Sequence, residues 1–344
     1  MFRDESEFVR WLQARAPRGD SHLKLGIGDD AALVEVRRGH ELILTTDMSI
    51  EEVHFSSRLH SPRSVGHRAL ARSLSDIAAM GGVPRYALVS LALSRRATRA
   101  WVAALYEGLI ELARGFGVTI IGGDTAVVPR TTMIDVLVAG EVRRGRAIRR
   151  SGTQPGELLY VSGRLGLAAL GLRLLESQPR KRASINVARA RTPHTGRLPW
   201  AEAACDSEAI QAHLYPQPQC ALGRYLAARR LATAMIDLSD GLSTDLNRLC
   251  EAGGVGARVW TELLPHPHLE DLHDSLQLAL HGGEDYQLLF TVDPRQASRF
   301  PARFRGIPLH HIGEITRAKR VVLHQATGRV ETLRPRGYDH FRRD

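Results

Sequence analysis

The sequence predicts a two-domain protein of the mixed α/β (α+β) class. Apolar runs that read as strands alternate with helical segments along the chain, an order typical of these folds. A length of 344 residues fits two domains. The stretch 151–156 contains Gly and Pro and reads as a linker. We therefore expect an N-terminal domain at 1–150 and a C-terminal domain at 151–344.

Hydrophobic periodicity and turn residues place the elements of the first half. One helix begins at Ser61-Pro62, an N-cap followed by proline at the first helical position, and stops at Gly81-Gly82. The next helix stops at Gly117. The predicted helices are 5–16, 61–80 and 99–115, and the predicted strands are 41–47, 85–93, 118–122 and 132–142.

The second half has the same alternating order. Residues 177–218 are rich in Arg, Pro and polar residues without a clear period, so they form an insertion or a loop over a cleft. The other predicted elements are helices at 165–176, 220–230, 241–252, 269–280 and 294–304, and strands at 158–162, 233–238, 257–260, 286–292, 309–315 and 320–324.

Composition excludes several classes of protein. Hydrophobic residues make up 43% and charged residues 24%, as in a globular protein. We see no signal-peptide pattern and no apolar run long enough to span a bilayer, so no membrane association is expected. The scattered Cys205, Cys220 and Cys250 suggest neither zinc nor a disulfide framework. A reducing cytoplasm is therefore the expected location.

The net charge is +10, which attracts anionic ligands. There is no aromatic-interleaved basic patch, zinc finger or RNA-binding signature, so we do not expect nucleic-acid binding. Lys occurs only at positions 24, 181 and 319. The chain therefore has neither a P-loop nor the ATP site of a protein kinase.

Acidic residues recur beside glycines and at strand ends. Two carboxylates about 4 Å apart repel by about 4 kcal/mol at an effective dielectric near 20. Acids gathered in one cleft therefore imply Mg²⁺ or a similar hard cation, and magnesium beside a Gly-rich turn suggests phosphate. The acids concerned are Asp29 and Asp30 in the Gly26 turn, Asp47, Asp76, Asp124 after Gly122-Gly123, and Asp237 and Asp240 in Ile-Asp-Leu-Ser-Asp-Gly.

Each motif also has a simpler interpretation. The Gly26 turn is a plain acidic turn, or a nominal G-x-G-x-x-A dinucleotide pattern that lacks a good preceding strand. Asp76 is an exposed helical acid, and Asp124 or Asp240 caps a helix. Capping does not explain Asp237. Another motif, Gly282-Gly283-Glu284, precedes a strand, where the glycine pair could place Glu284 in a cleft.

Taken together and in this order, nine motifs resemble the thiamine-monophosphate kinase family. That family belongs to the ATP-binding superfamily of aminoimidazole ribonucleotide synthetase and selenophosphate synthetase. The matching stretches span nearly the whole chain: GIGDDAAL (26–33), TTDMSIEEVHF (45–55), ARSLSDIAAMGGVP (71–84), IGGDT (121–125), RRSGTQPGE (149–157), IDLSDGLSTDL (236–246), HGGEDYQLLFTV (281–292), IGEI (312–315) and GYDHF (337–341).

The resemblance implies a phosphotransferase that makes thiamine diphosphate from thiamine monophosphate, with ATP as co-substrate. Transfer would be direct and in line, with several Mg²⁺ ions between the phosphates and no catalytic nucleophile or strong base. It also implies a homodimer in which N-terminal sheets join into a barrel. The N-terminal domain would bind ATP and magnesium, and the C-terminal domain would close over nucleotide and substrate.

The family's functional residues carry over motif by motif. The implied magnesium ligands are Asp30, Thr45, Thr46, Asp47, Asp76, Asp124, Asp237 and Asp240. The implied ATP contacts are Gly123, Asp124, Arg150 and Ser239. The implied substrate contacts are His54 at the phosphate and Glu284 and Tyr338 near the thiazole and pyrimidine. Three positions depart from the family pattern: Glu52 replaces a usual Gly, and Tyr215 and Gln219 replace usual Arg residues.

Two alternatives remain. One is another activity of the superfamily. Selenophosphate synthetase, however, would be expected to have a reactive Cys near the N-terminus, and the first Cys in this chain is Cys205. Aminoimidazole ribonucleotide synthetase would not be expected to carry Val53-His54-Phe55 or the GYDHF stretch. The other is a non-catalytic nucleotide-binding protein, against which the complete set of mutually repelling acids argues.

Overall fold

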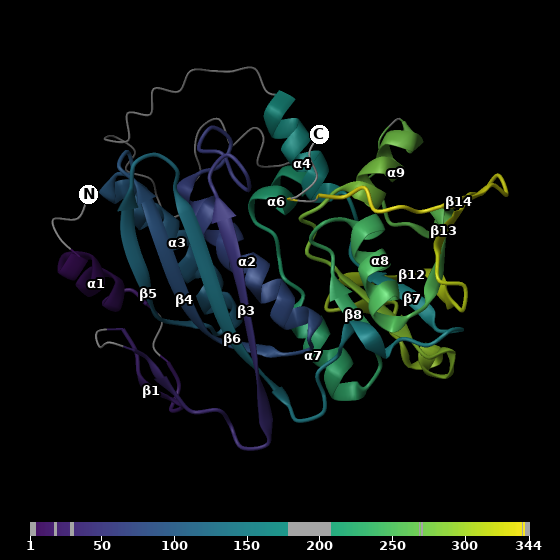
Figure 1. Ribbon diagram of the computed structural model, residues 1–344, viewed down its shortest axis with the longest axis horizontal. Helices are drawn as coiled ribbons and strands as arrows, with labels where there is room; N and C mark the ends of the chain where they lie inside the picture. The colour runs from purple at the N-terminus through teal and green to yellow at the C-terminus, as the bar shows by residue number, and fades with distance from the viewer. Residues whose placement is uncertain are drawn as a thin grey trace.

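The structure is a computed structural model that describes residues 5–16, 19–27, 31–177, 208–267, 269, 271–338 and 340. Two sheets with helices around them lie side by side, so the mixed α/β class is confirmed (Figure 1). No helix in these ranges is long and apolar enough to cross a membrane.

The N-terminal sheet has the strand order β3-β6-β4-β5. Strands β4 and β5 are parallel and joined by helix α3, whereas β6 runs antiparallel to β3 and β4. Helices α2 and α3 lie behind this sheet in Figure 1, which leaves its other face toward the viewer. The bounds are β3 His40–Ile50, α2 Pro62–Ala79, β4 Val83–Ser94, α3 Arg99–Phe116, β5 Thr119–Val128 and β6 Met133–Arg143.

A short hairpin and one helix precede this sheet: α1 Glu5–Gln13, β1 Leu23–Leu25 and β2 Leu33–Val34. Side chains near the hairpin, Leu23 and Ala32, pack against Tyr86, Ile121 and Ala139 of the sheet. The hairpin therefore covers part of the outer face.

The second sheet has the order β14-β13-β9-β12-β7-β10-β8, with β11 paired to β12. Its strands are β7 Leu158–Ser162, β8 Ala234–Asp237, β9 Gly256–Trp260, β10 Leu288–Val292, β11 Arg303–Phe304, β12 Ile307–Thr316, β13 Val321–His324 and β14 Val330–Thr332. The helices of this half are α4 Leu167–Ser177, α6 Glu208–Leu214, α7 Cys220–Arg229, α8 Leu242–Gly253 and α9 Leu272–His281.

Local sequence signals placed the helices of the first half well. The Ser61 side chain accepts a hydrogen bond from the backbone N–H of Ser64, as an N-cap does, and Pro62 is the first residue of α2. Helix α3 ends at Gly117, which has a left-handed φ of 67°. The predicted α2 and α3 are thus confirmed.

Three predictions about elements were wrong. Residues 294–304 form a 3₁₀ helix, Pro294–Arg299, and then β11, because Phe300 precedes a proline and is kept from helical backbone. Strand β5 does not stop at 122 but runs to Val128, so Gly122-Gly123-Asp124 lies within a strand. Helix α6 lies in a segment expected to be irregular, and residues 178–207 of that segment fall outside the described residues.

Helix α2 is the central element of the packing. It lies between the N-terminal sheet and helix α7, and its apolar residues Leu70, Leu74 and Ile77 are fully buried. An amphipathic surface helix would have one polar face toward water. Arg63 of α2 pairs with Glu111 of α3 at the surface, whereas Arg68, Arg72 and Asp76 lie where the two halves of the molecule meet.

Candidate functional site

Arg68, Arg72 and Asp76 lie on one face of α2, since residues four apart stack along a helix. They place two guanidinium groups and a carboxylate along the junction between the two halves. Asp76 lies at one end with other acids, and Arg68 lies at the other end with His54 and Glu284. This row of charges organises the candidate site.

Asp76 and Asp237 form the core of the acidic end. Thr45 donates a hydrogen bond to Asp76, and Ser75 donates one of 2.7 Å to Asp237, which is buried. Burial raises the pKa of both carboxyls, and the neighbouring carboxylates Asp237 and Asp47 raise that of Asp76 further. The Arg150 guanidinium acts in the opposite direction on both. The predicted residues Thr45, Asp47, Asp76, Asp237 and Arg150 are therefore neighbours.

The chemistry of this end fits a hard divalent cation. Buried carboxylates that repel one another are stabilised by a metal ion, and hydroxyl and carboxylate oxygens are the ligands that Mg²⁺ prefers. Within the described ranges, no three His, Cys, Asp or Glu side chains form a metal-binding group by themselves. A further predicted ligand, Asp30, lies outside the described residues.

Side chains alternate between the two faces of strand β3, which separates Thr46 from the other predicted ligands, Thr45 and Asp47. Side chains of Thr45 and Asp47 are partly buried on the side of α2, whereas Thr46 between them points to the other, exposed face. There the Thr46 hydroxyl donates to both oxygens of Asp135, at 2.8 and 2.9 Å. Thr46 is thus not brought together with Asp76.

Asp124 also lies away from the acidic end. It is exposed on β5, and Ser90 of β4 lies between it and Asp135 in the strand register. The described contact of its carboxylate is with the backbone N–H of Thr125. A Cβ atom at Gly123 would lie 1.9 Å from the Val89 carbonyl oxygen, so this position requires glycine.

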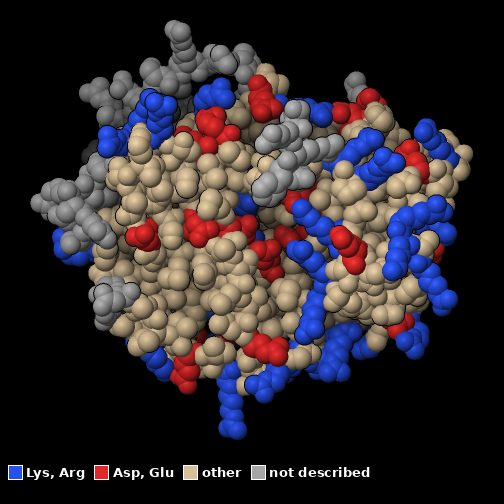
Figure 2. Space-filling model, viewed as in Figure 1, with Lys and Arg blue, Asp and Glu red and all other residues tan. Residues whose placement is uncertain are grey.

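Figure 2 shows this outer face as a mainly uncharged surface crossed by several acidic residues, with Lys and Arg more frequent over the C-terminal half. The register aligns Asp124, Ser90 and Asp135 across three strands, and Thr46 of β3 joins them through its hydrogen bond to Asp135. We call this set the outer row. It is separate from the acidic end on α2.

The loop that carries Ser239 and Asp240 is held by a residue that the sequence analysis missed. Asp245 is fully buried, and its carboxylate accepts hydrogen bonds from the Asp240 backbone N–H, at 3.0 Å, and from Arg248, at 2.9 Å. Arg248 also pairs with the Asp240 carboxylate. A Cβ atom at Gly337 would lie 1.8 Å from the Asp240 carbonyl oxygen, so glycine lets the C-terminal segment approach this loop.

The other end of the row contains the predicted substrate residues. Arg68 donates hydrogen bonds to Glu284, at 2.6 Å, and to the His54 carbonyl, at 3.3 Å. The His54 ring lies 5.1 Å from the ring of His340, which contacts Tyr338 edge-on at 4.8 Å. The structure thus gathers His54, Glu284 and Tyr338 from three distant parts of the chain.

Glu284 adopts a left-handed backbone, with a φ of 67°, that few residues other than glycine adopt. Burial acts to raise the pKa of its carboxyl, but the Arg68 guanidinium outweighs it and lowers the pKa to about 2. His213 of α6 lies 3.5 Å from the second carboxylate oxygen. The carboxylate is therefore negatively charged at neutral pH and held in one place.

His54 is neutral at neutral pH. Its Nδ1 accepts a hydrogen bond from the Ile50 backbone N–H, which leaves the proton on Nε2. Burial, together with the charge of Arg72, lowers its pKa to about 4. A neutral imidazole with an Nε2 proton can donate a hydrogen bond to a phosphate oxygen.

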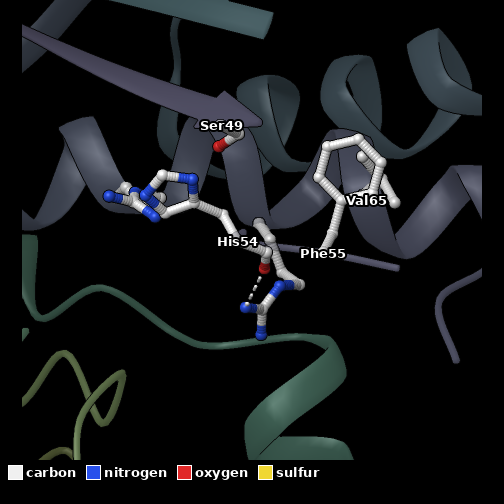
Figure 3. Close-up of a pocket in the computed structure, with 6 residues that line it drawn as sticks. Ser49, His54, Phe55 and Val65 are labelled. Carbon is white, nitrogen blue, oxygen red and sulfur yellow. Dashed lines mark hydrogen bonds between the residues drawn. The ribbon is translucent and has the colours of Figure 1, made fainter. Parts of the chain in front are cut away.

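A small cavity lies against His54, and Figure 3 shows its lining residues. Ser49, His54, Phe55 and Val65 form its walls together with Arg68 and Arg72, and the dashed line is the hydrogen bond from Arg68 to the His54 carbonyl. The cavity measures about 10 Å³, room for about one water, so a larger ligand would lie at its mouth.

The three departures from the family pattern have physical consequences. Glu52 has a φ of 64°, a backbone that favours glycine, and its side chain bonds to Ser56. Tyr215 packs edge-on against His67, and Gln219 donates to the Gln217 carbonyl. Tyr215 and Gln219 therefore make neutral local contacts in place of any arginine contact.

Several residues of the site were given no role by the sequence, although Arg72 and Asp245 lie within motifs quoted above. The structure adds Arg68, Arg72 and His213 at the junction, Asp135 in the outer row and Asp245 below the Asp240 loop. A signal for two of them exists: Arg68 and Arg72 precede Asp76 at helical spacing on an otherwise apolar helix. Nothing local marks the others.

Comparisons with known proteins agree over nearly the whole chain. Family models of AIR synthase related proteins match residues 28–142 (N-terminal domain) and 154–325 (C-terminal domain). The thiamine-monophosphate kinase of Bacillus subtilis is 34% identical, covering 98% of this chain and 100% of the relative.

Two solved structures are also similar. The crystal structure of thiamine-monophosphate kinase from Stenotrophomonas maltophilia K279a has a TM-score of 0.75 at 33% identity, covering 92% of this chain and 94% of that chain. AaThiL complexed with AMPPCP and TMP has a TM-score of 0.71 at 29% identity, covering 98% and 97%. With the two domain matches, these similarities confirm the two-domain synthetase-like fold, and the chain belongs to the thiamine-monophosphate kinase family of AIR synthase related proteins.

Proposed function

We propose that the protein phosphorylates thiamine monophosphate with ATP and releases thiamine diphosphate, a step in the biosynthesis of that cofactor. The observation that carries the proposal is the row on α2. At one end of the row, Asp76 lies among buried acids suited to a metal ion. At the other end, Arg68 contacts the fixed polar groups of His54 and Glu284. AaThiL, which shares the fold, has been solved with AMPPCP and TMP together.

Magnesium would be held at the acidic end. Asp47, Asp76 and Asp237 would supply negative charge there, and Thr45 a hydroxyl oxygen. Asp240 belongs to the proposed set, as does Asp30, which lies outside the described residues. When bound, the ions neutralise the phosphates of donor and acceptor. Ser75 and Thr45 orient the carboxylates by hydrogen bonds. In-line transfer between two phosphates then needs positioning, and no side chain has to act as a nucleophile.

The substrate would lie at the opposite end of the row. The Nε2 proton of His54 can be donated to its phosphate, and the Glu284 carboxylate can face the cationic thiazolium ring. Tyr338 offers an aromatic surface of the kind that binds organic cations. Arg68 keeps Glu284 charged and stationary, so that binding the cation does not require a new arrangement of the site.

The outer row leads to the proposed homodimer. Strand β3 is a long edge strand, and Leu42, Leu44 and Met48 are 44%, 61% and 46% exposed beside the outer row. Long apolar edges favour pairing with another sheet. We infer that a second copy covers this face and joins its sheet to this one. Thr46 and Asp124 would then act as magnesium ligands where the two copies meet.

The remaining predicted roles are part of the same proposal. Asp124 of the outer row and its neighbour Gly123 would contact ATP. So would Arg150 near the acidic end and Ser239, whose carbonyl accepts a hydrogen bond from the Glu284 backbone N–H. The domain boundary is proposed at 150/151, close to the 3₁₀ turn Arg150–Gly152 between the two sheets. Free, buried thiols at Cys220 and Cys250 are consistent with the proposed cytoplasmic location.

The test follows the product by chromatography. Purified protein is incubated with ATP, MgCl₂ and thiamine monophosphate, and thiamine diphosphate is measured over time with an EDTA control. Magnesium-dependent product is expected. The Asp47→Asn variant should fold but lose turnover, because the change removes the negative charge of a proposed magnesium ligand and not an apolar core side chain.

Absence of product from a protein that still binds ATP would contradict the proposal. It would favour another activity of the superfamily or a non-catalytic nucleotide-binding role. Normal turnover by a folded Asp47→Asn variant would contradict the magnesium site proposed at the acidic end, but not the proposed reaction.

A further inference from the structure

Arg72 occupies the middle of the row on α2 and faces both ends of the site. Its Nε atom lies 3.7 Å from the Asp47 carboxylate at the acidic end. Its charge also lowers the pKa of His54 and of Glu284 at the substrate end. The guanidinium group therefore lies where donor and acceptor phosphates would meet.

Arg72 uses none of its hydrogen-bonding capacity within the described residues. Its Nε atom is inaccessible to water and has no hydrogen-bond partner, and its side chain is only 18% exposed. The whole guanidinium group makes no hydrogen bond to the described part of the chain, and 3.7 Å is too long for one to Asp47. By contrast, Arg68, one turn earlier on the helix, donates hydrogen bonds to Glu284, His54 and His213.

A buried polar donor without a partner is costly, so this arrangement has to have a use. A guanidinium group stays charged in a folded protein, and the carboxylates of Asp47, Glu284 and Asp240 lie around Arg72. None of them saturates its planar fork of N–H donors. A phosphate group can do so, because its oxygens match the fork in a bidentate geometry.

We propose that Arg72 binds the phosphate group of the acceptor substrate, with His54 as the second donor. The proposal rests on the proposed function and adds a residue to which the sequence gave no role. Arg72 and His54 line the same cavity, whereas the cation near Asp76 and Asp237 is Arg150. This placement assigns Arg72 to the acceptor phosphate and not to ATP.

The role has a physical reason. An acceptor phosphate must approach the γ-phosphate of ATP, and the two negatively charged groups repel each other. A guanidinium group fixed on a buried helix reduces that repulsion without having to be ordered first. Arg72 would therefore bind the phosphate in the ground state and position it for attack.

The experiment separates phosphate recognition from stability. Arg72→Met keeps the apolar stem and removes the fork, and Arg63→Met on the same helix is the matched control because Arg63 pairs with Glu111 at the surface. Dissociation constants of thiamine monophosphate and of unphosphorylated thiamine are measured by calorimetry, and KM values for thiamine monophosphate and ATP by the product assay. Circular dichroism checks the fold.

For Arg72→Met we expect the KM for thiamine monophosphate to rise about tenfold or more, since hydrogen bonds to charged groups contribute 1.5–3 kcal/mol. The KM for ATP should stay within about twofold. The preference for thiamine monophosphate over thiamine should fall by a similar factor. Arg63→Met should change none of these values.

Three results would overturn the proposal: unchanged binding of thiamine monophosphate, an equal loss for thiamine and thiamine monophosphate, or a rise in the KM for ATP alone. If Arg72→Met does not fold, Arg72→Lys decides, because it keeps the charge but not the fork; an unchanged KM would refute the role and a several-fold rise would support it. An inactive wild-type protein would refute the proposed function instead, and the calorimetric preference for phosphate would still test Arg72.

Discussion

Arg68 of α2 donates a 2.6 Å hydrogen bond to the carboxylate of Glu284, a residue 216 positions further along the chain. The Arg68 side chain is only 6% exposed, and it also bonds to the backbone of His54 and His213. This single guanidinium group thus connects the N-terminal half, helix α6 and the Glu284 loop at the point where the substrate would bind.

Replacing Arg68 by Met should lower the free energy of unfolding by about 3 kcal/mol, because it leaves a largely buried carboxylate unpaired. Urea denaturation would measure the change. Arg63→Met, which breaks a more exposed ion pair on the same helix, should cost about 0.5 kcal/mol or less. Equal losses in the two variants would show that the Arg68–Glu284 pair has no special role.

A buried histidine pair makes the junction sensitive to acid. The Nε2 atoms of His60 and His213 are 2.9 Å apart, so the two rings share one proton, and Arg68 and Glu284 flank them. Burial lowers the pKa of His60 to about 4 and that of His213 to about 3, from an ordinary value of 6.5. Below pH 6.5 the unfolded chain therefore binds protons that the folded protein does not.

The pair should thus contribute its full stability above pH 6.5, and this should be lost as the pH falls toward about 4. We expect His213→Gln to reduce the slope of unfolding free energy against pH in this window by about 1 kcal/mol per unit. The difference from wild type is the relevant quantity, because Asp245 and Asp285 have pKa values raised to about 7 by burial and act in the opposite direction. Identical slopes would exclude the pair as an acid-sensitive element.

Asp237→Asn should separate stability from metal binding. Removing a buried carboxylate beside other acids should raise the unfolding free energy in EDTA, at about pH 8, by on the order of 1 kcal/mol. Added MgCl₂ should stabilise the wild type and not the variant. Thermal denaturation with and without MgCl₂ measures both effects, and a variant that kept the full magnesium response would exclude Asp237 as a ligand.

Glu52→Gly should stabilise the protein by about 1 kcal/mol, because a left-handed backbone strains residues with a Cβ atom. Its exposed contacts with Ser56 and Arg58 offset little of this gain. Val53→Gly is the matched control: its backbone does not have positive φ, so added flexibility should destabilise it by about 1 kcal/mol. Equal shifts in melting temperature for both variants would contradict the strain.

Leu44→Arg should weaken self-association, since Leu44 is 61% exposed on the proposed dimer face. Sedimentation velocity should show a wild-type dimer and a monomeric variant. Leu263→Arg places the same side chain on the C-terminal half, at another exposed leucine, and should remain dimeric. A monomeric wild type would rule out the proposed dimer.

The sequence alone predicted the features that depend on near neighbours. The N-cap of α2 at Ser61, its proline start and its apolar period are local, and they defined the helix that carries the site. The order of acidic and glycine motifs pointed to magnesium and phosphate chemistry, because carboxylates have few other reasons to gather. The family that these motifs resemble is confirmed.

The tertiary structure decided which side chains lie on the same face and which residues far apart in the sequence meet. Thr45, Thr46 and Asp47 are consecutive, yet the pleat of β3 sends Thr46 to the outer face. Arg68 and Arg72 became site residues only because both sides of α2 are covered, which brings Arg68 to Glu284, 216 positions further along the chain, and leaves Arg72 near Asp47 without a hydrogen bond from its Nε atom. Local patterns determine which elements form, whereas long-range packing determines which side chains meet, how strongly they are desolvated and therefore what chemistry they can do.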